Sequence, residues 1–265
     1  MLCNHPWILV DKKDGSRRYL PCNNCVGCKI AHSREWAFRI MCELRTWQGQ
    51  GLFITLTYDN DHLPADQGLH KDHLQRFWKR LRKDIYPRKL KYYACGEYGD
   101  QFGRPHYHAI VFGLSLKDCD LISENWSFGF SKVGSVTYDS ARYVAGYVDK
   151  KFGVKKNKEV YGELQPPFQV CSQGIGYRYF EAHREDIESV GLTLNGQKMS
   201  IPRYFIKKAL IDTPGSSDFV ENLRDLVHKN QWNAFELQDF IDSLGKQKDL
   251  NAWRKRAAHQ SVRMK

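Results

Sequence analysis

The segment from Gly103 to Phe112 constrains the fold of this chain more than any other stretch. Its residue pattern predicts a β-strand, on which successive side chains point to opposite faces of a sheet. His106 and His108 therefore share one face, whereas Tyr107 and Ala109 lie on the other. Two imidazoles held two residues apart on a rigid strand form a chelate for a divalent cation.

Glu97 is the predicted third ligand of this cation. It ends a second strand-like run that starts at Lys91, and the glycine-containing segment 98–103 between the two runs has the composition of a turn. In the resulting hairpin, Glu97 lies opposite or diagonal to His106. The expected site has two histidines, one carboxylate and open positions for substrate oxygens. An isolated His-x-His pair is more commonly a solvated pair of strand histidines.

A predicted helix over residues 143–150 carries two phenols and an ammonium group on one face. Tyr143, Tyr147 and Lys150 stand at positions i, i+4 and i+7, which lie above one another on a helix. Tyrosine hydroxyls are candidate nucleophiles, and a nearby cation stabilises a phenolate. The alternative is an aromatic stripe in the core with a lysine that reaches out to solvent.

The N-terminal segment contains three closely spaced cysteines, Cys22, Cys25 and Cys28. This spacing suits a metal better than long-range disulfides, and Cys3 would complete a tetrahedral site of four thiolates for a structural Zn²⁺. The alternative is a group of reduced cysteines that only pack together. Rival candidates for the fourth ligand are His5, His32 and Cys42.

Composition favours a polyanionic partner. The 265 residues include 41 Lys and Arg against 30 Asp and Glu, a formal net charge of +11. Nucleic acid is the leading candidate and an anionic membrane surface the other. We expect no membrane span and no secretory leader, because no apolar stretch approaches the length of a bilayer and the N-terminus lacks the charged start of a signal peptide. The cysteine usage indicates a reducing cytosol.

Periodicity predicts further elements around these motifs. Ser33 is the expected cap of a helix that runs to about Gln48, and Asp139 or Ser140 is the expected cap of the tyrosine helix. A helix over residues 70–85 has an apolar side and a dense basic side. That basic side is either solvated or in contact with DNA phosphates, and its members are Arg76, Lys79, Arg80, Arg82 and Lys83.

The order of these features resembles that of the rolling-circle replication initiators called HUH endonucleases. A strand over residues 53–58 comes first, the His-x-His strand follows, and the helix with two tyrosines comes last. The tyrosine pair places the resemblance with the two-tyrosine branch. The chain is most similar to the initiators of Microviridae, of gokushovirus type. Further segments carry this similarity: PCNNCVGC at 21–28, SREWA at 33–37, GIGY at 174–177 and IPRY at 201–204.

The resemblance implies an α+β fold with a central antiparallel sheet of about five strands and flanking helices. We expect helices on one face of the sheet, and the metal hairpin and tyrosine helix meeting on the other. The expected organisation is a Cys-rich segment over residues 1–32, an HUH endonuclease domain over 33–212, and a helical C-terminal extension over 213–265, which follows a Pro/Gly/Ser-containing boundary.

The resemblance also implies an activity. One tyrosine would nick the viral origin and stay on the 5′ end, and the second would act after a full circle has been copied. Glu97, His106 and His108 would hold Mg²⁺ or Mn²⁺ against the scissile phosphate, and Lys150 would orient that phosphate. The partners would be single-stranded and replicative-form viral DNA and, as a candidate, a host replicative helicase, in the cytoplasm of the infected bacterium. Candidate stacking partners for bases are Trp78, Phe102 and Tyr107.

Two other classes of protein share some of these features. A plasmid relaxase or single-strand transposase would use the same histidines, but the close tyrosine pair and the cysteine cluster favour replication. A noncatalytic zinc-bearing DNA-binding protein would explain the charge and the cysteines and leave the tyrosines and histidines without a role. A nicking assay that depends on added metal separates this class from a nuclease.

Overall fold

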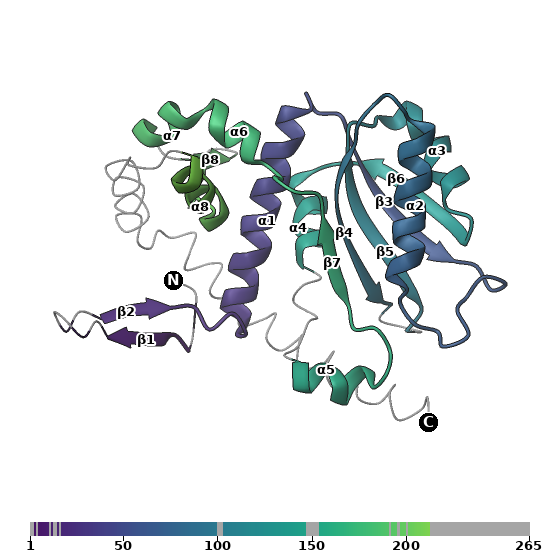
Figure 1. Ribbon diagram of the computed structural model, residues 1–265, viewed down its shortest axis with the longest axis horizontal. Coiled ribbons are helices and arrows are strands. Elements are labelled where there is room, and N and C mark those ends of the chain that lie inside the picture. Colours follow the sequence, from purple (N-terminus) through teal and green to yellow (C-terminus); the bar gives the residue numbers. More distant parts are fainter. Residues whose placement is uncertain are drawn as a thin grey trace.

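A five-stranded antiparallel sheet with helices packed on both faces forms the centre of the computed structural model (Figure 1). The strand order is β6-β3-β5-β4-β7, so β5 lies in the middle of the sheet. This arrangement confirms the α+β class and the expected number of strands. The strands are β3 (Gly51–Tyr58), β4 (Lys91–Tyr98), β5 (Pro105–Phe112), β6 (Gly129–Ser135) and β7 (Phe168–Cys171). The structure describes residues 3, 5–10, 12, 15, 17–99, 103–146, 154–190, 192–194, 197–199 and 201–212.

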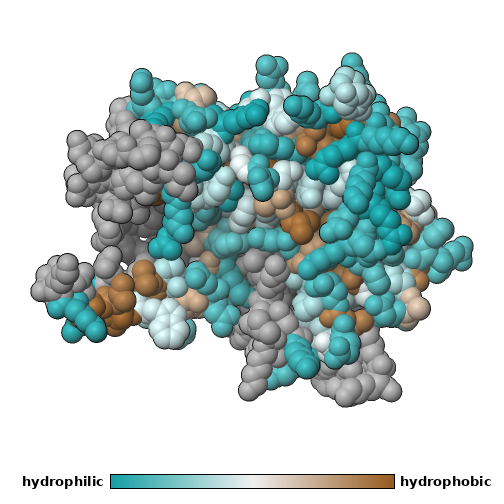
Figure 2. All heavy atoms as spheres, viewed as in Figure 1, coloured by the Kyte–Doolittle hydropathy of each residue, from teal (hydrophilic) through white to brown (hydrophobic). Residues whose placement is uncertain are grey.

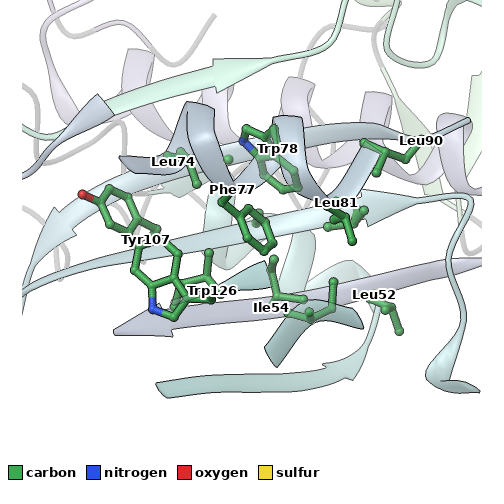
Figure 3. Close-up of a cluster of buried hydrophobic side chains, with 14 of the residues drawn as sticks. Leu52, Ile54, Leu74, Phe77, Trp78, Leu81, Leu90, Tyr107 and Trp126 are labelled. Atoms are coloured by element: carbon green, nitrogen blue, oxygen red, sulfur yellow. The ribbon is translucent and has the colours of Figure 1, made fainter. Parts of the chain in front are cut away.

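One face of the sheet is covered by α2 (Lys71–Asp84) and α3 (Cys119–Asn125), the latter preceded by the short 3₁₀ helix η1 (Leu116–Asp118). The apolar side of α2 packs on the strand residues of this face, among them Tyr107 (Figure 3). Trp126, which follows α3, is 1 % exposed and closes the same cluster. The helix expected over residues 70–85 is confirmed.

The opposite face is covered by α1 (Val26–Thr46) and α4 (Tyr138–Gly146). The expectation that only the metal hairpin and the tyrosine helix would meet there is corrected, because the long α1 packs on this face as well. The central strand explains why. On β5, Ile110 and Phe112 point to the side opposite Val111, and all three are fully buried. A strand that is apolar on both faces needs cover on both.

Helix α1 begins earlier than the sequence pattern predicted. Its N-cap is Cys25, whose side chain accepts from the backbone N–H of Cys28. Ser33, the predicted cap, lies more than one turn inside the helix, and its hydroxyl donates to the carbonyl of Arg142 at 3.2 Å. The helix therefore runs continuously from the cysteine motif into the sheet-packing stripe, across the expected boundary at residue 32.

The cap of the tyrosine helix also differs from the prediction. Thr137, and not Asp139, precedes α4 in the capping position. Its Oγ1 accepts from the N–H of Ser140 at 3.1 Å, and the Ser140 hydroxyl accepts from the N–H of Thr137 at 2.8 Å. This reciprocal pair satisfies two backbone donors at the start of the helix.

A third cluster attaches the C-terminal part of the described chain to α1. Phe38 and Cys42 of α1 pack with Phe180 and Phe205. The elements of this part are α5 (Val154–Tyr161), α6 (Tyr177–Ala182), α7 (Arg184–Val190), β8 (Leu192–Leu194), β9 (Gln197–Met199) and α8 (Arg203–Asp212). The C-terminal extension expected over residues 213–265 lies outside the described residues.

The GIGY segment has a structural role at this junction. Gly176 adopts a positive φ of 78° and donates its N–H to the carboxylate of Glu43 at 2.6 Å. A Cβ atom at Gly176 would lie 2.6 Å from the carbonyl oxygen of Arg39, so only glycine fits. Glu43 is fully buried and also accepts from Lys91 Nζ at 2.9 Å and Trp47 Nε1 at 2.9 Å. These contacts join α1, β4 and the start of α6.

The hairpin of β1 (Trp7–Val10) and β2 (Arg17–Leu20) pairs only within itself. All four side chains of β1 are exposed, and Trp7 is 70 % exposed. Apolar atoms lie over this hairpin as brown spheres at the lower left of Figure 2. Among the helices that the structure describes, none combines the length and the apolar character needed to cross a bilayer.

Candidate metal centre and tyrosine helix

The strand register brings Glu97 and the two histidines together on one face of the sheet. Glu97 of β4 pairs directly with His106 of β5, as the alternation predicted. On the other side of β5, Thr57 and Thr55 of β3 pair with His106 and His108. Directly paired residues of antiparallel strands point to the same face, so these five side chains form one row across three strands.

A single carboxylate oxygen lies between the two imidazoles. Glu97 Oε1 is 2.8 Å from His106 Nε2 and 3.2 Å from His108 Nε2. Glu97 and His108 are only 2 % and 5 % exposed. His106 is half-buried, so the centre opens to solvent on its side. The expected ligand set, with two histidines and one carboxylate, is therefore assembled.

The contacts of the other ring nitrogens fit a bound divalent cation. His106 Nδ1 lies 3.0 Å from the carbonyl oxygen of Arg104, and His108 Nδ1 lies 2.9 Å from Thr55 Oγ1. The carbonyl can only accept, so His106 carries its proton on Nδ1 and leaves Nε2 as a ligand. Thr55 can hold His108 in the same tautomer. Metal-binding histidines are oriented in this way by acceptors at their second nitrogen.

Tyr143 on α4 lies next to this centre. Its ring is 5.3 Å from the His108 ring and 6.2 Å from the Phe53 ring, measured between centroids. Tyr143 is 51 % exposed, so the interpretation of this residue as core packing is wrong. Tyr147 and Lys150 lie outside the described residues, and their place on the same helix face stays a prediction.

Small residues allow α4 to approach α1 and the sheet. Ala141 and Ala145 stand one turn apart on α4, are fully buried, and pack in one cluster with Ala37 of α1. Gly146 continues this contact, since a Cβ atom there would lie 3.6 Å from Ser33 Oγ. The buried small side chains determine the helix rotation and leave Tyr143 on the side that faces His108.

The four cysteines predicted to hold Zn²⁺ are also brought together. The Sγ atoms of Cys3, Cys22, Cys25 and Cys28 all lie within 4.8 Å of one another. Two of the Sγ–Sγ distances, Cys22 to Cys28 and Cys25 to Cys3, are 3.9 Å. A tetrahedral Zn²⁺ with bonds to sulfur of ~2.3 Å requires about 3.8 Å between ligands, so this group fits the ion.

The rival fourth ligands are used elsewhere. His32 Nε2 accepts from Trp36 Nε1 at 3.2 Å, and Cys42 is buried in the cluster that joins α1 to α6 and α8. His5 is an exposed residue and is not part of the sulfur group. Cys3 is therefore the member that completes the four-sulfur group within the described residues.

The basic side of α2 lies across the sheet from Glu97, because α2 packs on the face that carries Tyr107. Two of its arginines make contacts inside the protein. Arg76 forms an ion pair with Asp72, and Arg80 donates to the carbonyl of Asn125 at 2.7 Å. Lys79, Arg82 and Lys83 are exposed, on a surface that Figure 2 shows as largely hydrophilic. DNA binding by this side of α2 stays a prediction.

The aromatic residues predicted to stack on bases are wrong where the structure describes them. Trp78 is 2 % exposed and Tyr107 is fully buried, so neither presents a ring to a ligand; Phe102 lies outside the described residues. Phe130 was missed. It is 70 % exposed on the edge strand β6 and pairs with Thr57, on the face of the metal centre. The alternating pattern of Phe128, Phe130 and Lys132 is the signal that pointed to it.

Fold and site together define a class of protein, an α+β sheet protein with a histidine–carboxylate metal centre beside a tyrosine-bearing helix. The family model of the replication-associated protein ORF2 (gene 2 protein) matches residues 51–152, which include this centre. Replication-associated protein ORF2 of Spiroplasma virus 4 is 32 % identical over 280 residues, covering 91 % of this chain and 87 % of that protein. The chain belongs to this family of phage replication-associated proteins, which confirms the gokushovirus-type resemblance.

Two further relatives match over a shorter region. Replication-associated protein ORF4 of Chlamydia phage 1 is 34 % identical over 210 residues, covering 70 % of this chain and 52 % of that protein. Replication-associated protein VP4 of Bdellovibrio phage phiMH2K is 32 % identical over 210 residues, covering 70 % of this chain and 65 % of that protein. No solved structure matches the chain.

Proposed function

We propose that this protein initiates rolling-circle replication of a phage genome by nicking one strand at the viral origin and later rejoining the ends. The observation that carries the proposal is the position of Tyr143, whose ring lies 5.3 Å from that of His108 in the metal centre. A nucleophile and a centre for phosphate binding thus share one partly open face of the sheet. The family membership supports the replication role.

The chemistry conserves the energy of the phosphodiester bond. The phenol oxygen of a tyrosine attacks the scissile phosphorus and loses its proton, the bond from phosphorus to the 3′ oxygen breaks, and that oxygen takes up a proton. The DNA then has a free 3′-hydroxyl, and its 5′ phosphate is joined to the tyrosine. Attack of a 3′-hydroxyl on this phosphotyrosine reverses the step and seals a strand without an added nucleotide cofactor.

Glu97, His106 and His108 would hold Mg²⁺ or Mn²⁺. When bound, such an ion polarises a phosphate oxygen and offsets charge on the leaving 3′ oxygen. The protein contributes orientation: Thr55 and the Arg104 carbonyl hold the two imidazoles with Nε2 toward the centre. Burial of Glu97 keeps water from competing for its carboxylate oxygen.

Phe130 and Lys132 supply a path for single-stranded DNA toward this centre. They lie on the edge strand β6 and pair with Thr57 and Thr55, which are the neighbours of the histidines on β3. Both are exposed. An exposed ring stacks on bases of any sequence, and an ammonium group binds the backbone phosphate, so the pair fits an unpaired strand better than a duplex.

The second nucleophile in this proposal is Tyr147, and Lys150 orients the phosphate. In a helix, both project from the same side as Tyr143. One tyrosine opens the origin, and the other receives the strand after one round of copying. The partners are the single-stranded and replicative forms of viral DNA in the cytoplasm of the infected bacterium, with a host replicative helicase as a candidate partner of residues 213–265.

Covalent capture with labelled single-stranded origin DNA tests the proposal. We expect wild-type protein to form a protein–DNA adduct that survives a denaturing gel and requires added Mg²⁺ or Mn²⁺. Tyr143→Phe and Tyr147→Phe should each impair a full cycle of cleavage and joining, and the double variant should form no adduct. Tyr138→Phe, on the same helix, is the matched control. An adduct in the double variant would refute these nucleophiles.

A further inference from the structure

A second histidine–carboxylate group lies on the other face of the sheet, at the start of α2. One nitrogen of His70, one of His73 and one carboxylate oxygen of Asp72 all lie within 4.8 Å of one another. From this geometry we propose that His70, Asp72 and His73 form a further site for a divalent transition-metal ion of the zinc class. The site is separate from the Glu97 centre and from the four cysteines, and it does not depend on the proposed nicking activity.

The contacts of the two imidazoles support ligation. His70 Nε2 lies 3.0 Å from Asp66 Oδ1, and its Nδ1 faces Asp72 Oδ1 at 3.7 Å. His73 Nδ1 lies 2.9 Å from the Tyr58 hydroxyl, and its Nε2 faces Asp72 Oδ2 at 3.9 Å. Each ring is thus held at one nitrogen by an oxygen that can accept its proton, and presents the other nitrogen to the same carboxylate. Metal-binding histidines are oriented in this way.

The spacing requires only a small closure. Bonds from Zn²⁺ to nitrogen or oxygen of ~2.0–2.2 Å place the ligand atoms of a tetrahedral site about 3.4 Å apart. The distances of 3.7 and 3.9 Å exceed this by a few tenths of an ångström. Asp72 is 53 % exposed in its side chain and has room to make the adjustment, whereas His73 is 16 % exposed and fixed.

Rigid packing holds the histidines in place. The His73 ring stacks on Phe128 at 4.2 Å and on His70 at 4.9 Å between centroids. His70 occupies the N-cap position of α2, but its side chain makes no capping hydrogen bond. The imidazole of His70 is therefore not needed to start the helix, and its Asp66 contact directs it toward Asp72.

Arg76 is the competing cation at this position, because it forms an ion pair with Asp72 Oδ2. The other oxygen, Oδ1, faces His70. Monodentate binding through Oδ1 would leave the ion pair with Arg76 intact. Two nitrogens and one oxygen are the donors that Zn²⁺, Co²⁺ and Ni²⁺ prefer, whereas Mg²⁺ and Ca²⁺ prefer all-oxygen sites.

Such an ion would connect α2 to the strand that bears His106 and His108. Tyr107 lies between these histidines on β5, and its side chain points to the α2 face. Its hydroxyl accepts from the N–H of His70 at 2.8 Å and contacts the Tyr58 hydroxyl at 2.7 Å. Metal binding at His70 and His73 would therefore hold both ends of this hydroxyl pair from behind the Glu97 centre.

Calorimetric titration of full-length protein with Zn²⁺, after its cysteine cluster has been filled, tests the site. We expect Asp72→Asn and His73→Gln each to lose one equivalent of bound zinc relative to wild type. Asp66→Asn, which removes only the acceptor for His70 Nε2–H, should weaken the site about 10-fold. His62→Gln changes a nearby exposed histidine that contacts Asp59, and it should keep the wild-type number of sites.

Arg76→Gln separates ligation from the ion pair, because it breaks the pair and leaves Asp72 in place. We expect it to keep the extra equivalent of zinc and to bind it as tightly as wild type or more tightly. Loss of the same equivalent in Arg76→Gln and Asp72→Asn would overturn the proposal, as would wild-type stoichiometry and affinity in both Asp72→Asn and His73→Gln. Near-ultraviolet circular dichroism without added Zn²⁺ checks that each variant is folded.

Discussion

Replacing Thr55 by valine tests whether the orientation of His108 determines metal binding. Valine has nearly the shape of threonine, so the change removes the Oγ1 that lies 2.9 Å from His108 Nδ1 and little else. His108 is 5 % exposed, and water has poor access to replace the lost partner. The Nδ1 proton is then left unsatisfied, unless the ring adopts the other tautomer and donates from Nε2 to Glu97 Oε1, which is 3.2 Å away.

Both outcomes weaken the centre. An unsatisfied buried donor costs about 1–3 kcal/mol, and a proton on Nε2 occupies the position that a cation needs. Loss of an outer partner of a metal-binding histidine typically lowers metal affinity about 10- to 100-fold, or about 1.4–2.7 kcal/mol. We therefore expect the Mn²⁺ concentration at half-maximal adduct formation to rise about 10- to 100-fold in Thr55→Val.

The assay is adduct formation with labelled single-stranded origin DNA across a Mn²⁺ series. Because the perturbation lies in metal affinity, the rate at saturating Mn²⁺ should return close to that of wild type. Thr55→Ser keeps the hydroxyl and should retain the wild-type midpoint. Equal midpoints for the valine, serine and wild-type proteins would refute the role of Thr55. A valine variant whose rate is not recovered by Mn²⁺ would instead place the effect outside metal binding.

Three further outcomes are expected. Phe130→Ala should weaken binding of single-stranded DNA by about 1–3 kcal/mol in fluorescence anisotropy, while Leu116→Ala, another exposed apolar residue, should leave it unchanged. Glu43→Gln should lower the free energy of unfolding by about 3 kcal/mol in urea denaturation, because a buried carboxylate that accepts from Lys91 is lost; equal stability would contradict this. Cys25→Ser should lose one zinc equivalent per chain by metal analysis, whereas Cys119→Ser should retain it; a zinc-free wild type would refute the four-sulfur site.

Much of the metal centre was predictable from the sequence, because strand alternation is a local property of the backbone. Residues two apart on an extended strand share a face whatever surrounds them, so the pairing of His106 with His108 required no tertiary information. A short glycine-containing turn then placed Glu97 opposite His106, and this register is confirmed. The family was also identifiable from motif order and from segments such as GIGY, although the reason for that glycine, its contact with Glu43, was not.

Only the tertiary structure decided what depends on the neighbours of each element. Whether an aromatic residue is buried depends on the place of its strand in the sheet, so Tyr107 on the central strand is covered and Phe130 on the edge strand is exposed. The close position of Tyr143 beside His108 likewise depends on how small residues of α4 pack on α1. Local periodicity specifies which side chains share a face, but the packing of other elements determines which of those faces is left open for chemistry.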